Sequence, residues 1–301
     1  MPDFVMPVPP EVPADQHGEG TGELRYEDVA QDGRLRVVAL PAALAWTLWR
    51  PVLARRDGER ALSKHGIVPI LTRLTVTGTE ARVRLDQPAT GAGRFELAAR
   101  EVSGQVDRLY LNMWLSLSGR AGRLFPREGP GEPVVAGHLF AEHVFTRLFA
   151  PPGQRSVTSF AAVGHPDLPA VPTARYPGPS ATSAGELPAG ATWLDDAEVA
   201  DPVVTCFGLD QTDSNQHVNS LVYPRLFIEA TQRRLAAHGL SRAVLTRSLD
   251  IAFRKPCFAG DQVAVHLRLF RWGDDVGAAG VLRPVGQPDD SPRCFARLVA
   301  R

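Results

Sequence analysis

The chain has 301 residues, of which 44% are hydrophobic and 22% are charged. This length allows two domains, and the apolar content is sufficient for a sizeable core. The 33 basic and 33 acidic residues cancel, and no run of like charge supplies the basic stripe that nucleic-acid phosphates or anionic membranes attract. We therefore expect a soluble globular protein with neither a nucleic-acid nor a membrane partner.

The N-terminal segment, residues 1–22, is rich in proline and acidic residues, and we expect it to be a flexible tail. It lacks the basic region followed by an apolar region that marks a secretory signal. No stretch of the chain is apolar enough to span a bilayer, so a cytoplasmic location is expected. The three cysteines are widely spaced and form no CxxC motif, which argues against a disulfide framework or a zinc cluster.

Residues 23–150 are predicted to form a first unit, in which one helix precedes a set of strands. PAALAWTLWRPVLARR, residues 41–56, has the apolar pattern of a helix. Alternating apolar residues then predict strands around 70–76, 95–99 and 109–117. Residues 134–150 fit either a helix or a closing strand, and their position, which matches that of 292–300 in the second unit, favours a strand.

Residues 151–198 are dense in Pro, Gly, Ala and Ser without apolar periodicity, and we expect them to link the two units. The second unit, residues 199–301, repeats the layout of the first. Apolar residues at helical spacing predict a helix over 221–238, and alternation predicts strands at 249–253, 263–269 and 294–298. A helix on an antiparallel sheet, occurring twice, indicates the α+β class.

The segment DSNQHVNS, residues 213–220, gathers an acid, carboxamides, an imidazole and hydroxyls just before the second predicted helix. Pro224 is best tolerated in the first helical turn, so DSNQH is expected in the loop that leads into the helix. The amides at a helix start lack intrahelical acceptors and can stabilise a negative charge. The alternative is that these residues only cap the helix.

These residues carry a resemblance to a known family. DSNQHVNSLVY followed by IEATQRRLAAHG resembles the D-x-N-x-H-V-N-N-x-x-Y pattern of the hot-dog-fold thioesterases, particularly the acyl-ACP thioesterases. LDIAFRKPCFAGDQVAVHLRL resembles the strand, turn and hairpin that follow in the same superfamily. The resemblance covers 199–301 closely and the first half only by layout. It implies a double hot-dog fold, in which two antiparallel sheets are each wrapped around a long helix, in tandem in one chain.

The resemblance also implies which residues are catalytic. The family's Asp, Asn and His match Asp213, Asn215 and His217. Thioester hydrolysis needs an activated water or a carboxylate nucleophile, together with donors for the thioester oxygen. The donors are expected from the amides at the helix start, with Asn219 and Ser220 as oxyanion or positioning groups; a plain capping role remains open for Asn219. Pro256 stands where the family has a second acid.

Two further residues are secondary candidates. Cys257 suggests a Cys-His nucleophile pair, but a lone cysteine beside a turn is more often a small buried hydrophobe. Glu229 matches the family's E-x-x-x-R pattern with Arg233, which is also the spacing of an ordinary helical ion pair. No third ligand accompanies Asp213 and His217 at a recognisable metal-binding spacing, so we expect no metal and no cofactor.

The first predicted helix has no acid, amide or histidine near its start, so the first unit is expected to be non-catalytic. Its expected role is to pair its sheet with that of the second unit and to shape a tunnel for the acyl chain. Trp46 and Trp49 on its helix, with Met113 and Leu115 on its longest strand, are the candidate tunnel residues. The alternative for all four is that they are ordinary core residues.

The leading functional hypothesis is hydrolysis of an acyl thioester to the free acid and the thiol, in fatty acid or polyketide metabolism. The expected partner is an acyl carrier protein or coenzyme A that carries the acyl group, and the expected assembly is a monomer with an internal pseudo-dimer or a homodimer. An acyltransferase that uses the same site, and a non-catalytic acyl-binding module, remain as alternatives. A dehydratase is disfavoured because the H-x-x-x-G-x-x-x-x-P motif is absent.

Overall fold

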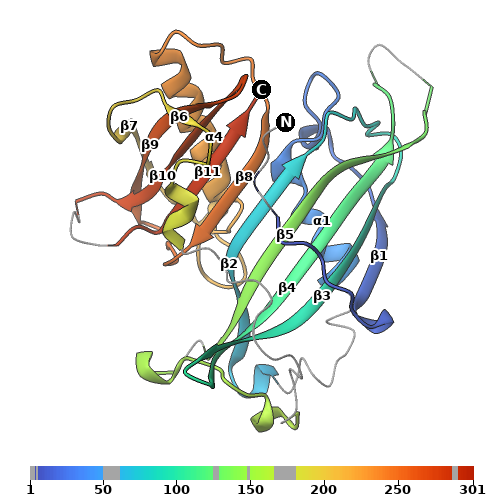
Figure 1. Cartoon of the computed structure of the whole chain (residues 1–301), viewed down its shortest axis with the longest axis vertical. Coiled ribbons are helices and arrows are strands. Elements are labelled where there is room, and N and C mark those ends of the chain that lie inside the picture. The colour runs from blue at the N-terminus through green and yellow to red at the C-terminus, as the bar shows by residue number, and fades with distance from the viewer. Residues whose placement is uncertain are drawn as a thin grey trace.

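The computed structural model describes residues 4, 6–49, 62–124, 129–147, 150–165, 181–286 and 291–301. Its main feature is one 11-stranded sheet with the order β1-β3-β4-β5-β2-β8-β11-β10-β9-β6, to which β7 adds by pairing with β9. All the strand pairs are antiparallel (Figure 1). The strands are β1 (His17–Gly22), β2 (Ile67–Gly78), β3 (Ala89–Val102), β4 (Gln105–Arg120), β5 (Pro133–Arg147), β6 (Thr192–Trp193), β7 (Val199–Cys206), β8 (Thr246–Phe253), β9 (Gln262–Trp272), β10 (Asp275–Pro284) and β11 (Cys294–Ala300).

The two halves of the sheet have the same internal order and meet at β2 and β8. The first half runs β3-β4-β5-β2 and the second β9-β10-β11-β8, so the strand after each helix lies at the junction. At this junction Leu74 lies opposite Ile251, and Val76 lies opposite Leu249. The repeat of layout that the sequence predicts is therefore present in the topology.

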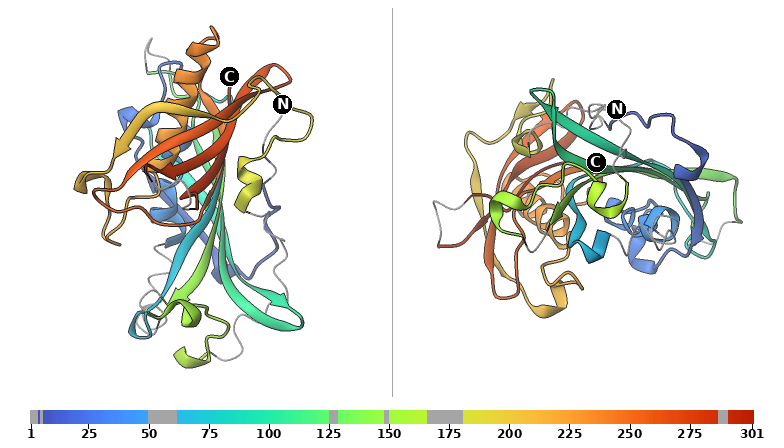
Figure 2. Two further views of the ribbon diagram at one scale, coloured as in Figure 1. Left: turned by 90° about the vertical axis from the view of Figure 1, so that its left-hand side faces the viewer. Right: turned by 90° about the horizontal axis from the view of Figure 1, so that it is seen from below.

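Each half also carries a helix. The second predicted helix is α4 (Val222–Ala237), close to the predicted bounds. The first begins as α1 (Ala42–Leu44) and continues as a π-helical turn, η4 (Ala45–Trp49), while the rest of the predicted segment, 50–56, lies outside the described residues. Both helices lie on the same side of the curved sheet, which we call the inner face (Figure 2). Short 3-10 segments occur at Ala14–Gln16, Tyr26–Asp28, Val37–Ala39, Pro152–Gln154, Ala161–Val163, Ala181–Gly185 and Leu209–Gln211.

A single hydrophobic cluster fills the inner face across both halves. Leu115 of β4 lies opposite Leu139 of β5, Leu139 lies opposite Val76 of β2, and Val76 lies opposite Leu249 of β8. All four side chains are buried in one cluster, which also contains Phe227 of α4. Because this row of apolar side chains crosses the junction without interruption, the two halves share one core.

The first helix packs unusually close to the edge of the sheet. A Cβ atom added at Gly20 of β1 or at Gly91 of β3 would collide with the main chain or side chain of Trp46 or Thr47. Glycine at these positions therefore lets η4 lie directly on the two strands. The first helix can therefore approach this end of the inner face closely, because no side chains lie between it and the two strands.

Four strands were not predicted. Residues 17–22, expected within a flexible tail, form β1, which pairs with β3. Most side chains of β7 are exposed, so its sequence lacks the apolar alternation that predicts a strand. Strand β10 contains Gly277 and Gly280, and glycine normally disfavours strands. A Cβ at Gly280 would collide with the main chain of β9, so packing demands glycine where propensity argues against a strand. Within the expected linker, β6 is part of the sheet. The prediction that favours a strand over a helix for residues 134–150 is confirmed for 134–147, which lie in β5.

The N-terminal segment crosses the outer face of the sheet. Phe4 stacks on Trp272 of β9 with ring centroids 5.9 Å apart, and Trp114 of β4 donates a hydrogen bond from Nε1 to the Pro7 carbonyl at 2.9 Å. Arg94 of β3 donates to the Pro10 carbonyl at 3.0 Å. The described part of the expected tail thus contacts both halves. Among the described residues no helix is long and apolar enough to cross a membrane.

A buried carboxylate joins the halves on the outer face. Asp250 of β8 is 1% exposed and accepts hydrogen bonds from Arg73 Nε at 2.8 Å and Nη2 at 2.5 Å. Thr75 Oγ1 donates to it at 3.1 Å, and Arg297 Nε of β11 donates at 3.2 Å. Arg73 and Thr75 belong to β2, so this network links the two halves beyond their main-chain pairing.

We predict that Asp250→Ala destabilises the protein by about 3 to 5 kcal/mol, because it leaves the buried Arg73 guanidinium without its carboxylate. Urea denaturation followed by circular dichroism measures the change. The matched control is Asp107→Ala, which removes an ion pair between Asp107, 34% exposed, and Arg100, 50% exposed. This substitution should lower the free energy of unfolding by less than about 1 kcal/mol. Equal losses in the two variants would contradict a special role for Asp250.

Candidate active site

The DSNQH segment forms a closed turn just before α4. Thr212 and Val218 form an isolated antiparallel bridge, the Asp213 N–H donates to the His217 carbonyl at 3.0 Å, and the Gln216 N–H donates to the Asp213 carbonyl at 2.9 Å. Gln216 closes the turn with φ of 64°, a left-handed conformation that is uncommon outside glycine. The turn therefore presents Asp213 and His217 side by side at its base.

The Asp213 carboxylate is held by groups of the same segment. Its Oδ1 accepts the Asn215 N–H at 2.9 Å, and its Oδ2 accepts Asn219 Nδ2 at 3.3 Å. His217 Nδ1 lies 3.8 Å from Oδ1. The Asp213 side chain is 24% exposed, so the carboxylate is fixed in direction yet still reachable by water and by a ligand.

Asn219 connects the turn to the helix. Its Oδ1 accepts the Leu221 N–H at 2.9 Å, its carbonyl accepts the Val222 N–H at 3.0 Å, and its own N–H donates to the Gln211 carbonyl at 2.9 Å. Asn219 thus fixes the segment that leads into α4 and orients Asp213 at the same time. Ser220, next in the chain, is half-buried and its hydroxyl makes no hydrogen bond with the described residues.

Contacts of Tyr223 and Cys257 connect the turn to the start of α4 and to the segment after β8; we call these contacts the clamp. Tyr223, in the first turn of α4, is 3% exposed and its Oη accepts the Cys257 N–H at 3.0 Å. The Cys257 carbonyl accepts the Val218 N–H at 2.8 Å. The turn, the helix start and the segment after β8 therefore meet at one residue. Tyr223 was not singled out from the sequence, although it is the last residue of the matching pattern.

The secondary candidates lie in different surroundings. Cys257 is fully buried, and burial raises the pKa of its thiol, which disfavours the thiolate that a nucleophile needs. Glu229 is 59% exposed on α4, with Oε2 at 3.9 Å from Arg233 Nη1. Arg233 instead makes closer contacts with Asp201 of β7. The contacts of Glu229 do not join it to the Asp213 cluster.

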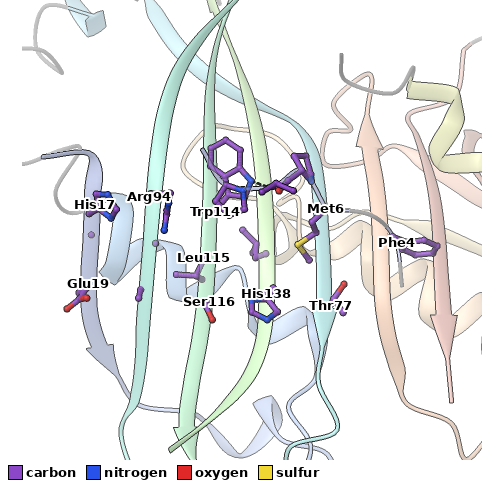
Figure 3. Close-up of a pocket in the computed structure, with 17 residues that line it drawn as sticks. Phe4, Met6, His17, Glu19, Thr77, Arg94, Trp114, Leu115, Ser116 and His138 are labelled. Carbon is purple, nitrogen blue, oxygen red and sulfur yellow. Dashed lines mark hydrogen bonds between the residues drawn. The ribbon is translucent and has the colours of Figure 1, made fainter. Parts of the chain in front are cut away.

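The expected tunnel residues lie in the first half. Met113 and Leu115 are buried on β4, and Trp46 and Trp49 pack at the border of the same cluster. A cavity of about 690 Å³ lies elsewhere, between the N-terminal segment and the outer face of the first half (Figure 3). Leu115 is among its lining residues, with Met6, Arg94, Trp114, Ser116 and His138. A tunnel that starts at Asp213 therefore stays a prediction.

Comparisons with known proteins define the fold. No protein-family model matches the chain, and no curated protein matches it in sequence. The 12:0-ACP thioesterase from Umbellularia californica superposes with a TM-score of 0.58 at 14% identity, over 95% of this chain and 97% of that chain. An acyl-ACP thioesterase from Bacteroides thetaiotaomicron VPI-5482 gives a TM-score of 0.57 at 13% identity, over 95% and 98%. The chain therefore has the same fold as these two proteins.

The contacts between Tyr223 and Cys257 predict different losses of stability for two conservative substitutions. Tyr223→Phe leaves the buried Cys257 N–H without an acceptor and should destabilise the protein by about 1 to 3 kcal/mol. Cys257→Ala keeps that main-chain bond and should cost on the order of 1 kcal/mol from lost packing. Parallel urea denaturation of the two variants tests this order. A larger loss for Cys257→Ala than for Tyr223→Phe would mean that the thiol, rather than the main chain, holds the clamp.

Proposed function

We propose that the chain hydrolyses acyl thioesters, carried by an acyl carrier protein or by coenzyme A, to the free acid and the thiol. The observation that carries this proposal is the Asp213 carboxylate, held by Asn219 and the Asn215 N–H at the start of α4. This carboxylate lies on a fold that the chain shares with two acyl-ACP thioesterases. The fold supports the proposal, and the placement of the residues gives it a mechanism.

In the proposed reaction Asp213 acts as the base. Its carboxylate takes a proton from water as the water oxygen bonds to the thioester carbonyl carbon. The carbon–sulfur bond then breaks, and the thiolate leaves and is protonated from the protonated Asp213 carboxyl. Asn215 and His217, which flank the carboxylate, order the attacking water. Because Pro256 brings no carboxylate to the turn after β8, Asp213 both accepts and returns the proton.

The negative charge that develops on the thioester oxygen needs donors. The hydroxyl of Ser220 and the amides in the first turn of α4 are the proposed donors, supported by the dipole of this 16-residue helix. Asn219 belongs to the positioning groups, because its side chain is already engaged by Asp213 and the Leu221 N–H. Cys257 and Glu229 have no part in this mechanism.

We further propose a double hot-dog organisation in one cytoplasmic chain. Units at 23–150 and 199–301, joined by 151–198, would each wrap a sheet around a helix. The equal strand orders of the two halves support this division. The junction through β2 and β8 has the character of a dimer interface built into one chain, so a monomer with an internal pseudo-dimer is the proposed assembly.

The acyl chain is proposed to cross the inner face from the second half into the first. Phe253, at the end of β8, packs edge-on against Tyr223 with ring centroids 5.6 Å apart. The continuous apolar row over β8, β2, β5 and β4 then leads to Leu115. Trp46, Trp49 and Met113 border the same region.

Asp213→Asn should lower kcat/KM for thioester hydrolysis by about 10²- to 10⁴-fold, because it removes the base. Its melting temperature should stay close to that of the wild type, since the amide can keep the bond to the Asn215 N–H. Thiol release from acyl-CoA and acyl-ACP panels, with analysis of the acyl product, gives the measurement. Cys257→Ala is the control and should keep most of the activity.

Near-normal hydrolysis by Asp213→Asn would move the chemistry away from this turn. A product in which the acyl group is transferred to an alcohol or amine, rather than released as the acid, would identify an acyltransferase.

Changing the volume at Leu115 should shift the preferred acyl length. Leu115→Ala should favour longer chains and Leu115→Phe shorter ones, because each buried methylene contributes roughly 0.8 kcal/mol. Hydrolysis rates across thioesters from C4 to C18 give the profile. Ser116→Ala is the matched control, since the neighbouring side chain faces the other side of the strand. A flat profile in the Leu115 variants, with only stability altered, would show that the chain binds elsewhere.

A further inference from the structure

A cavity of about 690 Å³ lies on the outer face of the first half, on the other side of the sheet from the helices (Figure 3). Strands β1 to β5 contribute its floor, and residues 6–9 of the N-terminal segment border it. Its volume is within the range of about 300 to 1,000 Å³ that is typical of small-molecule sites. Asp213 and His217 are not among the lining residues, so this cavity is separate from the candidate active site.

The sheet register brings three polar side chains together in this cavity. Ser116 of β4 lies directly opposite His138 of β5. Ser116 also lies opposite Ala92 of β3, two residues before Arg94, so Arg94 is its diagonal neighbour. Directly opposite side chains have Cβ atoms about 5 Å apart, and a diagonal of about 7 to 8 Å is within reach of a long side chain. Arg94, Ser116 and His138 can therefore contact one group of a ligand.

These three side chains have hydrogen-bond donors available. Arg94 Nη1 donates to the Pro10 carbonyl at 3.0 Å and lies 3.9 Å from the carboxylate of Glu11, a fully exposed side chain. The Arg94 side chain is 30% exposed, and its Nε and Nη2 donate to none of the described residues. The Ser116 hydroxyl and the His138 ring also make no hydrogen bond with the described residues. A guanidinium, a hydroxyl and an imidazole thus line the cavity together.

The rest of the lining is largely apolar. Residues 6–9 are a methionine, two prolines and a valine. Trp114 also lines the cavity, and because its Nε1 already donates to the Pro7 carbonyl at 2.9 Å, its ring offers a ligand apolar surface. The one carboxylate among the lining residues is Glu19 of β1, which forms no ion pair with Arg94. The cavity therefore combines one permanent positive charge with an apolar border.

We propose that this cavity binds a carboxylic acid with an apolar chain, and that Arg94, Ser116 and His138 hold its carboxylate. A carboxylate accepts two hydrogen bonds from a guanidinium and has further lone pairs for a hydroxyl and an imidazole. The chain lies against residues 6–9 and Trp114, where burial of its methylenes favours binding. This site is additional to the proposed function and does not depend on it, although the acids that thioester hydrolysis releases belong to the same class.

Calorimetric titration with octanoate tests the site directly. Arg94→Gln should raise the dissociation constant about tenfold, because it removes the charged donor. Octan-1-ol, which lacks the charge, should bind the wild type at least about tenfold more weakly than octanoate. Hexanoate should bind about 15-fold more weakly, since each buried methylene contributes about fourfold. Arg100→Gln is the matched control, because Arg100 is a 50% exposed arginine of the same strand that does not line the cavity; it should leave the dissociation constant unchanged.

Two further variants separate the ligand site from the anchoring of the N-terminal segment, since Arg94 also binds the Pro10 carbonyl. Ser116→Ala removes a donor that does not contact that segment and should weaken octanoate binding about fivefold. Ala92→Trp fills the floor of the cavity without removing a polar group and should abolish binding there. Both variants should keep the melting temperature and the rate of thioester hydrolysis of the wild type, because their side chains lie on the outer face.

Failure of this inference is distinguishable from failure of the proposed function, because the titrations measure binding without turnover. Equal affinity for octanoate and octan-1-ol, or unchanged octanoate binding in both Arg94→Gln and Ser116→Ala, would overturn the carboxylate site. Octanoate binding that persists undiminished in Ala92→Trp would place the ligand on the inner face and also overturn it. Absence of thioester hydrolysis, with these binding differences intact, would overturn the proposed function alone.

Discussion

The pairing of β2 with β8 is the constraint on which the rest of the structure depends. It brings together two strands that are far apart in sequence and makes one sheet from two halves. On the inner face this pairing aligns Val76 with Leu249, so the apolar row continues from one half to the other. On the outer face it places Thr75 opposite Asp250, where the carboxylate also binds Arg73. A one-residue slip would exchange the two faces and bury the charges in the core.

This junction also fixes the position of the candidate site in the second half relative to the first half. The start of α4 is fixed by a chain of short-range contacts through Asn219, Tyr223 and Cys257. Phe253 connects that clamp to the end of β8, the strand that pairs with the first half. These contacts therefore link the position of Asp213 to β8, the strand of the second half that lies at the junction. The Asp213 turn is therefore positioned relative to the first half through β8 and its main-chain pairing with β2.

Sequence patterns predicted the elements whose apolar residues recur at the period of a helix or a strand. The helix α4 and strands β2, β4, β8, β9 and β11 alternate or repeat their apolar residues with the expected period, because each has one face in the shared core. Strand β10 escaped prediction since Gly277 and Gly280 are selected by close contact with neighbouring strands, which is information about tertiary structure. Strand β1 escaped for a similar reason, as its glycines make room for Trp46. The contact of Phe4 with Trp272 joins residues too distant for any local pattern.

The candidate site also contains residues that the sequence predicted and residues that only the structure revealed. The polar cluster at 213–220 was visible because its members are adjacent in sequence and match a known pattern, and the structure brings them into one turn. Tyr223 and Cys257 are connected by a hydrogen bond from the Cys257 N–H to the Tyr223 hydroxyl across 34 positions, so their joint role needed coordinates.

The two halves share a topology but differ in what their helix starts carry. In the second half a polar turn precedes α4, whereas the first helix follows Leu40 and Pro41 and packs tightly on glycines of β1 and β3. Such close packing leaves no space for a ligand under η4 at that edge. Toward the junction, between β4 and β8, large apolar side chains rather than glycines cover the inner face. The half whose helix begins without polar groups is therefore joined to the candidate site through its strands, of which β2 pairs directly with β8.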